Sequence, residues 1–278
     1  MWETVKELQA ALVRWGYNIT VDGDLGSKTE TAIVKFQKDN HLYTDGIAGP
    51  ITWSLLDTAQ ETWHNVQKRL KFQKLKCDKF NGKGANVTYL REDSAIRFQS
   101  VCNELHAHGA IITSAGGRRL LSSAAGPNRS KTSLHYLGIA HDLSPRTGMV
   151  HPETDPYVIT LSDEKRRRWH VYARAKEGID RTLKAWKYDR KVKWVTDTFV
   201  CLTEVFEKNG FKPISARKSF FTGKNRGGAE WWHFQDETSL VPDETKFGDE
   251  LLKSFRLSKL KSYSVWDRRN ATWQRDWF

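Results

Sequence analysis

The sequence is poor in cysteine and has no long apolar run. Its three cysteines are odd in number and widely separated, so they form neither a disulfide framework nor a paired metal knuckle: Cys77, Cys102 and Cys201. We therefore expect free thiols and synthesis in a reducing compartment. No apolar run approaches the roughly 20 residues that a membrane-spanning helix needs, so we expect no stable membrane insertion.

The N-terminus also lacks the features of a secretory signal. Charged and apolar residues alternate from Met1 to Glu7, with no basic segment followed by an apolar one. We therefore expect that the protein either acts where it is made or leaves the cytoplasm by a route other than a secretory signal peptide.

Acidic residues are in the minority outside the first 60 positions. The net charge is +12, and residues 1–60 hold five Lys or Arg against eight Asp or Glu, so the remainder carries +15. A strongly basic region after residue 60 could bind nucleic acid, an anionic membrane or an anionic polymer such as a bacterial wall. No recognisable nucleic-acid motif accompanies the charge, and we expect no nucleic-acid partner.

The first 60 residues predict a small bundle of three helices. Apolar residues recur at helical spacing in three stretches, expected as helices around residues 5–13, 32–37 and 50–56. Two Asp-Gly pairs, Asp22-Gly23 and Asp45-Gly46, form a short internal repeat that is typical of tight turns.

This N-terminal pattern resembles the peptidoglycan-binding domain type 1 family along nearly its whole length. The resemblance implies a domain over residues 1–60 that holds an enzyme against the cell wall, with peptidoglycan as its partner. Most matching positions are core and turn residues, which establish the fold better than they identify a sugar contact. The matching residues are Leu8-Gln9, Gly16-Tyr17, Val21-Asp22-Gly23, Gly26, Thr29, Ala32, Phe36-Gln37, Leu42, Asp45-Gly46, Gly49, Thr52-Trp53 and Leu56.

Beyond this domain the pattern predicts an α+β fold. Residues 61–85 are Lys-rich and are interpreted as a linker, a connecting helix followed by a flexible turn. A helix is expected over 91–108, a buried strand over 110–114 and a helix over 195–208. Strand-like pieces follow near residue 214 and over 231–234, and helices around a few separated strands favour α+β.

Two short motifs carry the chemistry. The first is Ser133-x-His135-x-x-Gly138-x-Ala140-x-Asp142, and the second, far downstream, is Glu230-x-x-His233. A catalytic zinc ion needs three protein ligands and one open position for water, and two histidines with a carboxylate suffice. Gly138 permits a strand, a bend and a returning strand that aim both side chains at one point. A strand end or a bulge would bring Glu230 and His233 together.

These motifs resemble the M15 family of zinc D,D-carboxypeptidases and L-alanyl-D-glutamate endopeptidases. The resemblance implies that His135, Asp142 and His233 bind Zn²⁺ and that Glu230 is the general base and then the acid. It also implies a zinc D,D-peptidase or hedgehog-like domain over residues 86–245, with a small antiparallel sheet flanked by helices. The segment from Leu143 to about Trp194 is longer than in the smallest family members, and its role is unassigned.

The family also places an arginine after the strand ahead of the first ligand, to stabilise the oxyanion. Arg118 and Arg119 both stand there, and successive residues point apart, so only one can serve. We favour Arg118 because it comes first after the Gly116-Gly117 turn, which leaves Arg119 as a substrate contact. Ser133 is expected near the carboxylate of the substrate or as a brace of the site.

Several neighbouring residues have more than one interpretation. His141 should point away from Asp142 and is left out of the ligand set. Of Trp231 and Trp232 at least one is expected in the core, and Trp232 is a candidate substrate contact. The basic run at 165–168 is interpreted as a solvated helix face, with contact to an anionic polymer as the alternative. The basic, aromatic extension over 246–278 is expected to pack on the peptidase domain, with a membrane-active end as the alternative.

The order of the two domains, without a signal peptide, resembles phage endolysins. We therefore expect a monomeric lysin, made in the cytoplasm of a bacterial host, that cuts stem peptides in the cell wall. L-alanyl-D-glutamate endopeptidase activity is the first choice, and D-alanyl-D-alanine carboxypeptidase activity is the alternative. A non-catalytic wall-binding protein is a second alternative, against which the intact Glu230 argues.

Overall fold

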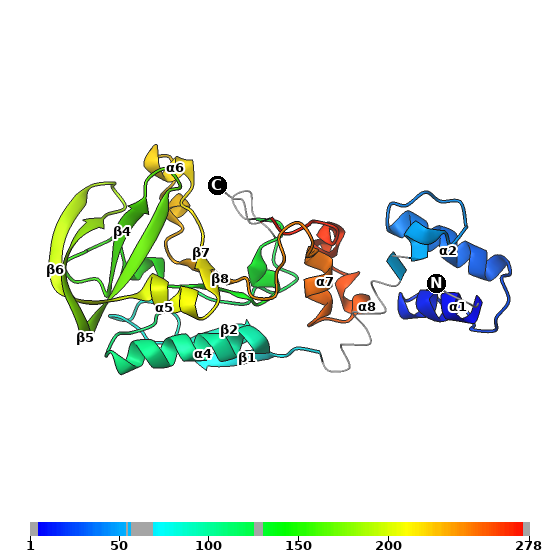
Figure 1. Ribbon diagram of the computed structural model, residues 1–278, viewed down its shortest axis with the longest axis horizontal. Coiled ribbons are helices and arrows are strands. Elements are labelled where there is room, and N and C mark those ends of the chain that lie inside the picture. Colours follow the sequence, from blue (N-terminus) through cyan, green and yellow to red (C-terminus); the bar gives the residue numbers. More distant parts are fainter. Residues whose placement is uncertain (1–4, 54, 57–68, 125–129, 275–278) are drawn as a thin grey trace. The chain divides into compact units, whose positions relative to one another are not determined.

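The computed structural model describes residues 5–53, 55–56, 69–124 and 130–274. The chain divides into two compact units (Figure 1). The first contains the described residues up to Arg69 together with Leu251–Trp266, and the second contains Leu70–Glu250 and the residues from Asp267 onward. Helices and small antiparallel sheets alternate along the second unit, in agreement with the expected α+β class.

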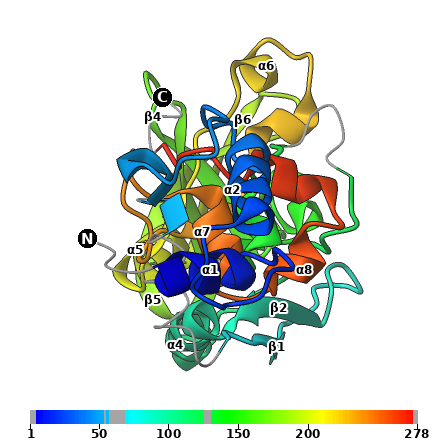
Figure 2. The same cartoon turned by 90° about the vertical axis from the view of Figure 1, so that its right-hand side faces the viewer.

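The N-terminal unit is built on helices α1, Val5–Arg14, and α2, Ser27–Asp39, which lie against each other (Figure 2). Their apolar faces meet in a core that includes Leu12, Ile33 and Phe36. The third expected helix begins at Pro50, and residues 50–53 and 55–56 are helical. Ser54 and the part of this segment after residue 56 lie outside the described residues, as does the expected connecting helix up to residue 68.

A buried glutamine closes the first Asp-Gly turn of this unit. The Nε2 of Gln9 donates to Asp22 Oδ1 at 2.6 Å, to the carbonyl of Asp24 at 2.9 Å and to Thr29 Oγ1 at 3.0 Å. In return the backbone N–H of Gly23 donates to Gln9 Oε1 at 2.7 Å. One amide side chain therefore ties the turn to both helices.

The second turn repeats this arrangement around Gln37. Its Nε2 donates to Asp45 Oδ1 at 2.7 Å, to the carbonyl of Ile47 at 2.9 Å and to Thr52 Oγ1 at 3.2 Å. The backbone N–H of Gly46 donates to Gln37 Oε1 at 2.9 Å. The internal repeat seen in the sequence is thus a repeated hydrogen-bonded clasp, each copy made by a glutamine and an Asp-Gly turn.

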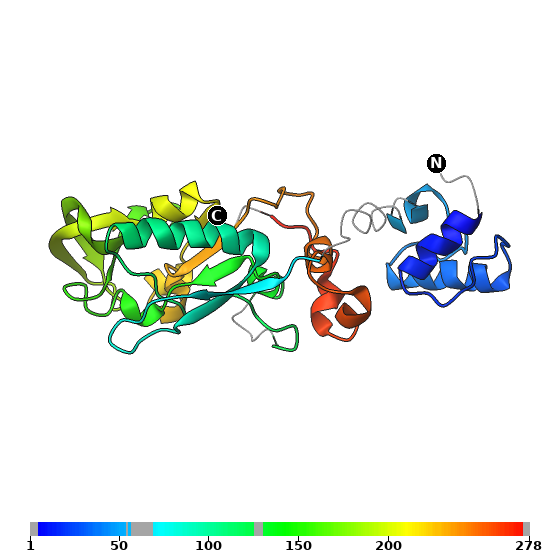
Figure 3. The same cartoon turned by 90° about the horizontal axis from the view of Figure 1, so that it is seen from below.

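The second unit begins earlier than the sequence indicates. Strand β1, Phe72–Lys76, lies within the segment that we interpreted as a linker and pairs antiparallel with β2, Val87–Arg91. Helix α4, Glu92–Ala107, packs on both strands (Figure 3) and matches the expected helix. The expected strand at 110–114 is instead an extended segment with single bridges at Thr113 and Ser114.

A three-stranded antiparallel sheet carries the two sequence motifs. Its order is β3, Ala140–Asp142, then β8, His233–Asp236, then β7, Phe211–Pro213. Helix α5, Leu202–Lys208, packs against β7. The expected helix over 195–208 is wrong in its first part, because residues 195–201 belong to a strand. Tertiary pairing overrides the helical spacing of apolar residues there.

The unassigned segment after Leu143 contributes to a sheet of its own. Strands β4, Tyr157–Asp163, β5, Arg168–Trp186, and β6, Val192–Cys201, pair antiparallel in this order. Val158, Ala185, Val195 and Phe199 form a small core of their own on it. The basic run at 165–168 is not a helix face, because residues 164–167 form the turn between β4 and β5.

Short helical turns complete the fold. They are η1 (Leu134–Tyr136), η2 (Pro145–Thr147), α6 (Lys218–Phe221), η3 (Arg226–Ala229), α7 (Phe247–Leu252), α8 (Leu257–Leu260) and η4 (Ser264–Arg268). Within the described ranges, no helix combines the length and the apolar character needed to cross a bilayer.

The C-terminal extension is divided between the two units. We expected residues 246–278 to pack together on the peptidase domain, but Leu251–Trp266 groups with the N-terminal unit. The described residues that follow, from Asp267 to Gln274, belong to the second unit, and the last four residues lie outside the described part.

The Gln37 clasp gives a first test. Replacing Gln37 by Met keeps the volume but leaves the Gly46 N–H and the acceptors of the clasp without their partner. We expect the free energy of unfolding of the N-terminal unit to fall by about 2–4 kcal/mol. Hydrogen exchange of the full chain, followed at the Gly46 amide, measures this loss. The exposed neighbour Lys38→Met is the control, and equal protection in the two variants would contradict the role of the clasp.

Candidate metal centre

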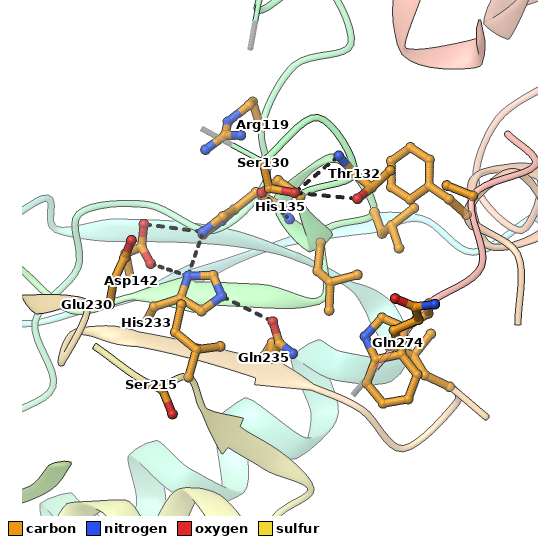
Figure 4. A pocket seen from close by; sticks show the side chains of 18 of the residues that line it. Arg119, Ser130, Thr132, His135, Asp142, Ser215, Glu230, His233, Gln235 and Gln274 are labelled. Atoms are coloured by element: carbon orange, nitrogen blue, oxygen red, sulfur yellow. Dashed lines mark hydrogen bonds and ion pairs between the residues drawn. The ribbon is translucent and has the colours of Figure 1, made fainter. Parts of the chain in front are cut away.

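Three side chains from the two motifs converge at one point (Figure 4). Nε2 of His135 lies 3.2 Å from Asp142 Oδ2, and Nδ1 of His233 lies 2.9 Å from Asp142 Oδ1. The two imidazoles approach each other at 3.3 Å between His135 Nε2 and His233 Nδ1. Residues that are 98 positions apart in the chain therefore present a compact set of two nitrogens and a carboxylate.

The spacing of these atoms fits a zinc ion. Ligands about 2.0–2.1 Å from a tetrahedral zinc ion lie roughly 3.3 Å from one another. The two imidazole nitrogens, 3.3 Å apart, agree with that edge length. One ligand atom from each of the three residues lies within 4.8 Å of the other two. Two imidazoles and one carboxylate are also a donor set that zinc accepts, and three protein ligands leave its fourth position open.

Local structure explains how the first motif brings its two ligands together. His135 lies in the 3₁₀ turn η1, and Ser133 caps that turn by accepting the backbone N–H of His135 at 3.4 Å. Gly138, with φ of +72°, then reverses the chain, and Asp142 follows on β3. The expected strand before the bend is therefore a helical turn. The register of β3 and β8 sets Asp142 directly opposite His233.

Second-sphere hydrogen bonds orient both imidazoles. Nδ1 of His135 donates to the carbonyl of Gly117, which leaves Nε2 for a metal. Nε2 of His233 lies 3.3 Å from the amide oxygen of Gln235, which assigns the proton to Nε2 and leaves Nδ1 for a metal. No motif indicates Gln235, although its position two residues after His233 on one strand places both on the same face.

The surroundings of Asp142 keep its carboxyl group ionised. Burial by itself raises the pKa of Asp142, but His135 and His233 outweigh it and hold the pKa well below its usual range. Asp142 is therefore a carboxylate, the form that binds a metal.

Glu230 lies beside this cluster in Figure 4 and comes from the end of η3. Its φ of 52° is left-handed, and this backbone turn just before β8 lets Glu230 and His233 face the same site. Burial raises the pKa of Glu230, although Arg217 opposes the shift through an ion pair of 2.8 Å to Oε1. Of the two expected arrangements, a strand end or a bulge, the structure has the strand end, with Glu230 in a left-handed turn just before β8. Arg217 is a site residue that no sequence motif indicated.

The two candidate arginines have different surroundings. The guanidinium of Arg118 lies 3.9 Å from the ring centroid of Phe72, and Arg118 is not among the described residues that line the groove at the metal cluster. Arg119 does line that groove. Its backbone N–H donates to the carbonyl of His135 at 2.8 Å, and its buried Nη1 has no hydrogen-bond partner among the described residues. This arrangement favours Arg119 and reverses the preference that the sequence suggested.

The groove has a volume of about 920 Å³ and extends well past the cluster. Ser133 and Trp232, two of the expected substrate contacts, lie in its wall, whereas Trp231 is buried and donates to the hydroxyl of Tyr188 at 3.1 Å. The wall also includes the three residues of the metal cluster, Glu230 and Arg119. Its remaining residues are Ser130, Thr132, Leu134, Leu137, Arg167, Ile214, Ser215, Ala216, Arg217, Asn225, Gly227, Gln235, Leu240, Thr245, Lys246, Phe247, Glu250, Ala271, Thr272, Trp273 and Gln274.

His141 lies outside the cluster, as its place in the motif predicts. Its Nε2 lies 3.1 Å from the carbonyl of Thr113 and its Nδ1 lies 3.2 Å from Thr88 Oγ1. Burial lowers the pKa of His141 to about 4, so the imidazole is neutral at pH 7. It packs as a core residue, with its ring centroid 4.4 Å from that of Phe98.

Comparison with known proteins supports both halves of this description. Residues 3–56 match the family model of a putative peptidoglycan binding domain. A zinc D-Ala-D-Ala carboxypeptidase of Streptomyces albus G is 26% identical over 146 residues, which are 51% of this chain and 57% of that protein. An uncharacterized protein in the bpoA1 3' region of Kitasatospora aureofaciens is 54% identical over 37 residues, 13% of this chain and 31% of that protein. No solved structure matches the chain.

These matches bear on the sequence analysis in two ways. The N-terminal resemblance is confirmed for residues 3–56. The likeness to a zinc carboxypeptidase agrees with the three-residue metal site, but the chain spans less than two thirds of the length of either relative.

The ligand set predicts how the protein binds metal. His135→Ala removes one of three ligands, and we expect the affinity for zinc to fall by at least about 100-fold. Equilibrium dialysis with metal analysis of the full chain measures it. His151→Ala, an exposed histidine outside the cluster, is the matched control and should bind as the unchanged protein does. Equal zinc binding by the two variants would exclude this site.

Gly138 gives a second test of the same site. A Cβ there would lie 2.5 Å from a ring carbon of Phe72 and 3.1 Å from the backbone nitrogen of Arg91, at a left-handed φ. We expect Gly138→Ala to lower the free energy of unfolding by about 2–4 kcal/mol and to weaken zinc binding. Gly49→Ala, where a Cβ meets nothing within 4 Å, is the control. Denaturant unfolding measures the stability of both, and an unchanged midpoint for Gly138→Ala would contradict the argument.

Proposed function

We propose that the chain is a zinc-dependent peptidase that hydrolyses stem peptides of peptidoglycan. The observation that carries this proposal is the convergence of His135, Asp142 and His233 beside Glu230 in one groove. The match of residues 3–56 to a putative peptidoglycan binding domain supports the choice of polymer. The zinc D-Ala-D-Ala carboxypeptidase among the relatives supports the class of reaction.

Zinc held by these three side chains would supply Lewis acidity to a water molecule and to a peptide carbonyl. Glu230 is the group of this chain that moves the proton. Its carboxylate accepts a proton from the attacking water and returns it to the amine that leaves. The ion pair with Arg217 holds the carboxylate at the groove.

Arg119 is the proposed oxyanion residue. It lines the groove, and its Nη1 has no hydrogen-bond partner among the residues that the structure describes. A donor left in this state can bind the carbonyl oxygen as negative charge develops on it. Ser133 and Trp232 in the same wall are the proposed substrate contacts.

The N-terminal unit is the proposed anchor to the wall. An anchor on the same chain raises the effective concentration of stem peptides at the zinc site without any new contact there. We further propose that the protein acts as a monomeric endolysin that is made in a bacterial host and lyses it. Cleavage between L-alanine and D-glutamate is the favoured reaction. Removal of the terminal D-alanine is the second candidate, which the named relative favours.

Glu230→Gln tests the mechanism. The amide keeps the shape of the side chain but cannot accept the proton, so we expect the rate of peptidoglycan hydrolysis to fall by about 10²–10⁴-fold. Zinc binding should remain, because Glu230 is not one of the three ligands. Glu177→Gln, at an exposed position of β5, is the control.

Mass spectrometry of digested peptidoglycan measures the rate and identifies the bond. New N-terminal D-glutamate indicates the endopeptidase, and released D-alanine indicates the carboxypeptidase. Hydrolysis at the same rate by wild type and Glu230→Gln would refute the mechanism, and no hydrolysis by wild type would favour a non-catalytic wall-binding protein.

A further inference from the structure

The last described residues of the chain form an arm along the second unit. This C-terminal arm, residues 269–274, pairs with residues 243–248 through backbone hydrogen bonds. The pairs are Asp243 N–H to Trp273 O at 3.0 Å, Trp273 N–H to Thr245 O at 2.8 Å, Phe247 N–H to Ala271 O at 2.9 Å and Gly248 N–H to Arg269 O at 2.8 Å. The ladder fixes the position of the arm.

The close approach of the two segments shows how tightly the arm is held. A Cβ added at Gly248 would lie 2.6 Å from the Cβ of Arg269 and 2.9 Å from its carbonyl oxygen. Only glycine fits there without displacing the arm. Arg268, just before the arm, donates from Nη1 to the carbonyl of Lys131 at 2.7 Å.

The arm forms part of the groove that contains the metal cluster. Thr272, Trp273 and Gln274 line it. Figure 4 shows Gln274 at the side away from Asp142 and Glu230, with Gln235 between them. The volume of about 920 Å³ is near the upper end of the roughly 300–1,000 Å³ of small-molecule sites. The groove therefore has room for more of a substrate than the two residues that flank a cleaved bond.

Donors without partners occur along this groove. The indole Nε1 of Trp273 is buried and has no hydrogen-bond partner among the described residues, and the same holds for Nη1 of Arg119 and the hydroxyl of Ser215. A buried donor without a partner is destabilising, so an acceptor on a ligand that reaches it would remove that cost. A peptide backbone offers carbonyl oxygens at regular intervals and suits donors that lie at separate positions along a groove.

We propose that the C-terminal arm is the distal wall of the substrate groove, and that Trp273 contacts a part of the stem peptide remote from the cleaved bond. This proposal rests on the proposed peptidase function and concerns how long a peptide the groove binds. The substrate is an extended peptide of several residues, bound at the zinc site by one part and at the arm by another. Contact with a remote part can contribute to the rate of cleavage.

The test compares two substrates on the full chain with zinc. The long one is the purified disaccharide pentapeptide, and the short one is the shortest blocked peptide that the wild-type protein cleaves. We expect Trp273→Ala to lower kcat/KM on the long substrate by about 5–30-fold and on the short one by less than about 2-fold. Trp194→Ala, a tryptophan that is 66% exposed on β6 and outside the groove wall, is the control.

Trp273→Phe keeps an aromatic ring but removes the indole N–H. It provides a second test if the alanine variant does not fold. An intermediate loss on the long substrate alone supports the contact. Equal losses on both substrates, or none on either, would overturn the proposal. If the wild-type protein cleaves neither substrate, the proposed peptidase function fails instead.

Discussion

The pairing of β3 with β8 is the constraint on which the site depends. It sets Asp142 opposite His233, so one register brings together residues that are 91 positions apart. A shift of one residue would move either side chain to the other face of the sheet. His135 could not compensate, because it reaches the cluster from the turn that precedes β3. The geometry of the candidate metal site therefore depends on the register of this sheet.

The sequence is most informative where side-chain chemistry and spacing are set by the site itself. Two motifs predict the ligands and Glu230, and the structure brings these residues together. The backbone that carries them is less predictable. His135 lies on a 3₁₀ turn and Glu230 in a left-handed turn, which the neighbouring contacts impose and the residue types do not reveal.

The features that the sequence did not indicate lie outside its motifs. Arg217 and the C-terminal arm reach the groove through tertiary contacts, which the sequence does not show. Gln235 lies two residues after His233 on the same strand and was missed because no motif includes it. Residues 195–201 of β6 are wrongly predicted as helix because their apolar spacing is compatible with one. In the N-terminal unit the Asp-Gly repeat is visible in the sequence, but the glutamines that close the turns are not. Gln9 lies 13 residues before Asp22, and Gln37 lies 8 residues before Asp45.

The segment from Gly117 to Arg119 is bound to His135 at both ends. Gly117 accepts from the imidazole, and Arg119 donates from its backbone to the carbonyl of the same histidine. The orientation of a metal ligand and the position of the proposed oxyanion arginine therefore vary together. A metal ion that fixes His135 would therefore also fix the backbone at Arg119, two residues beyond the carbonyl that orients the imidazole.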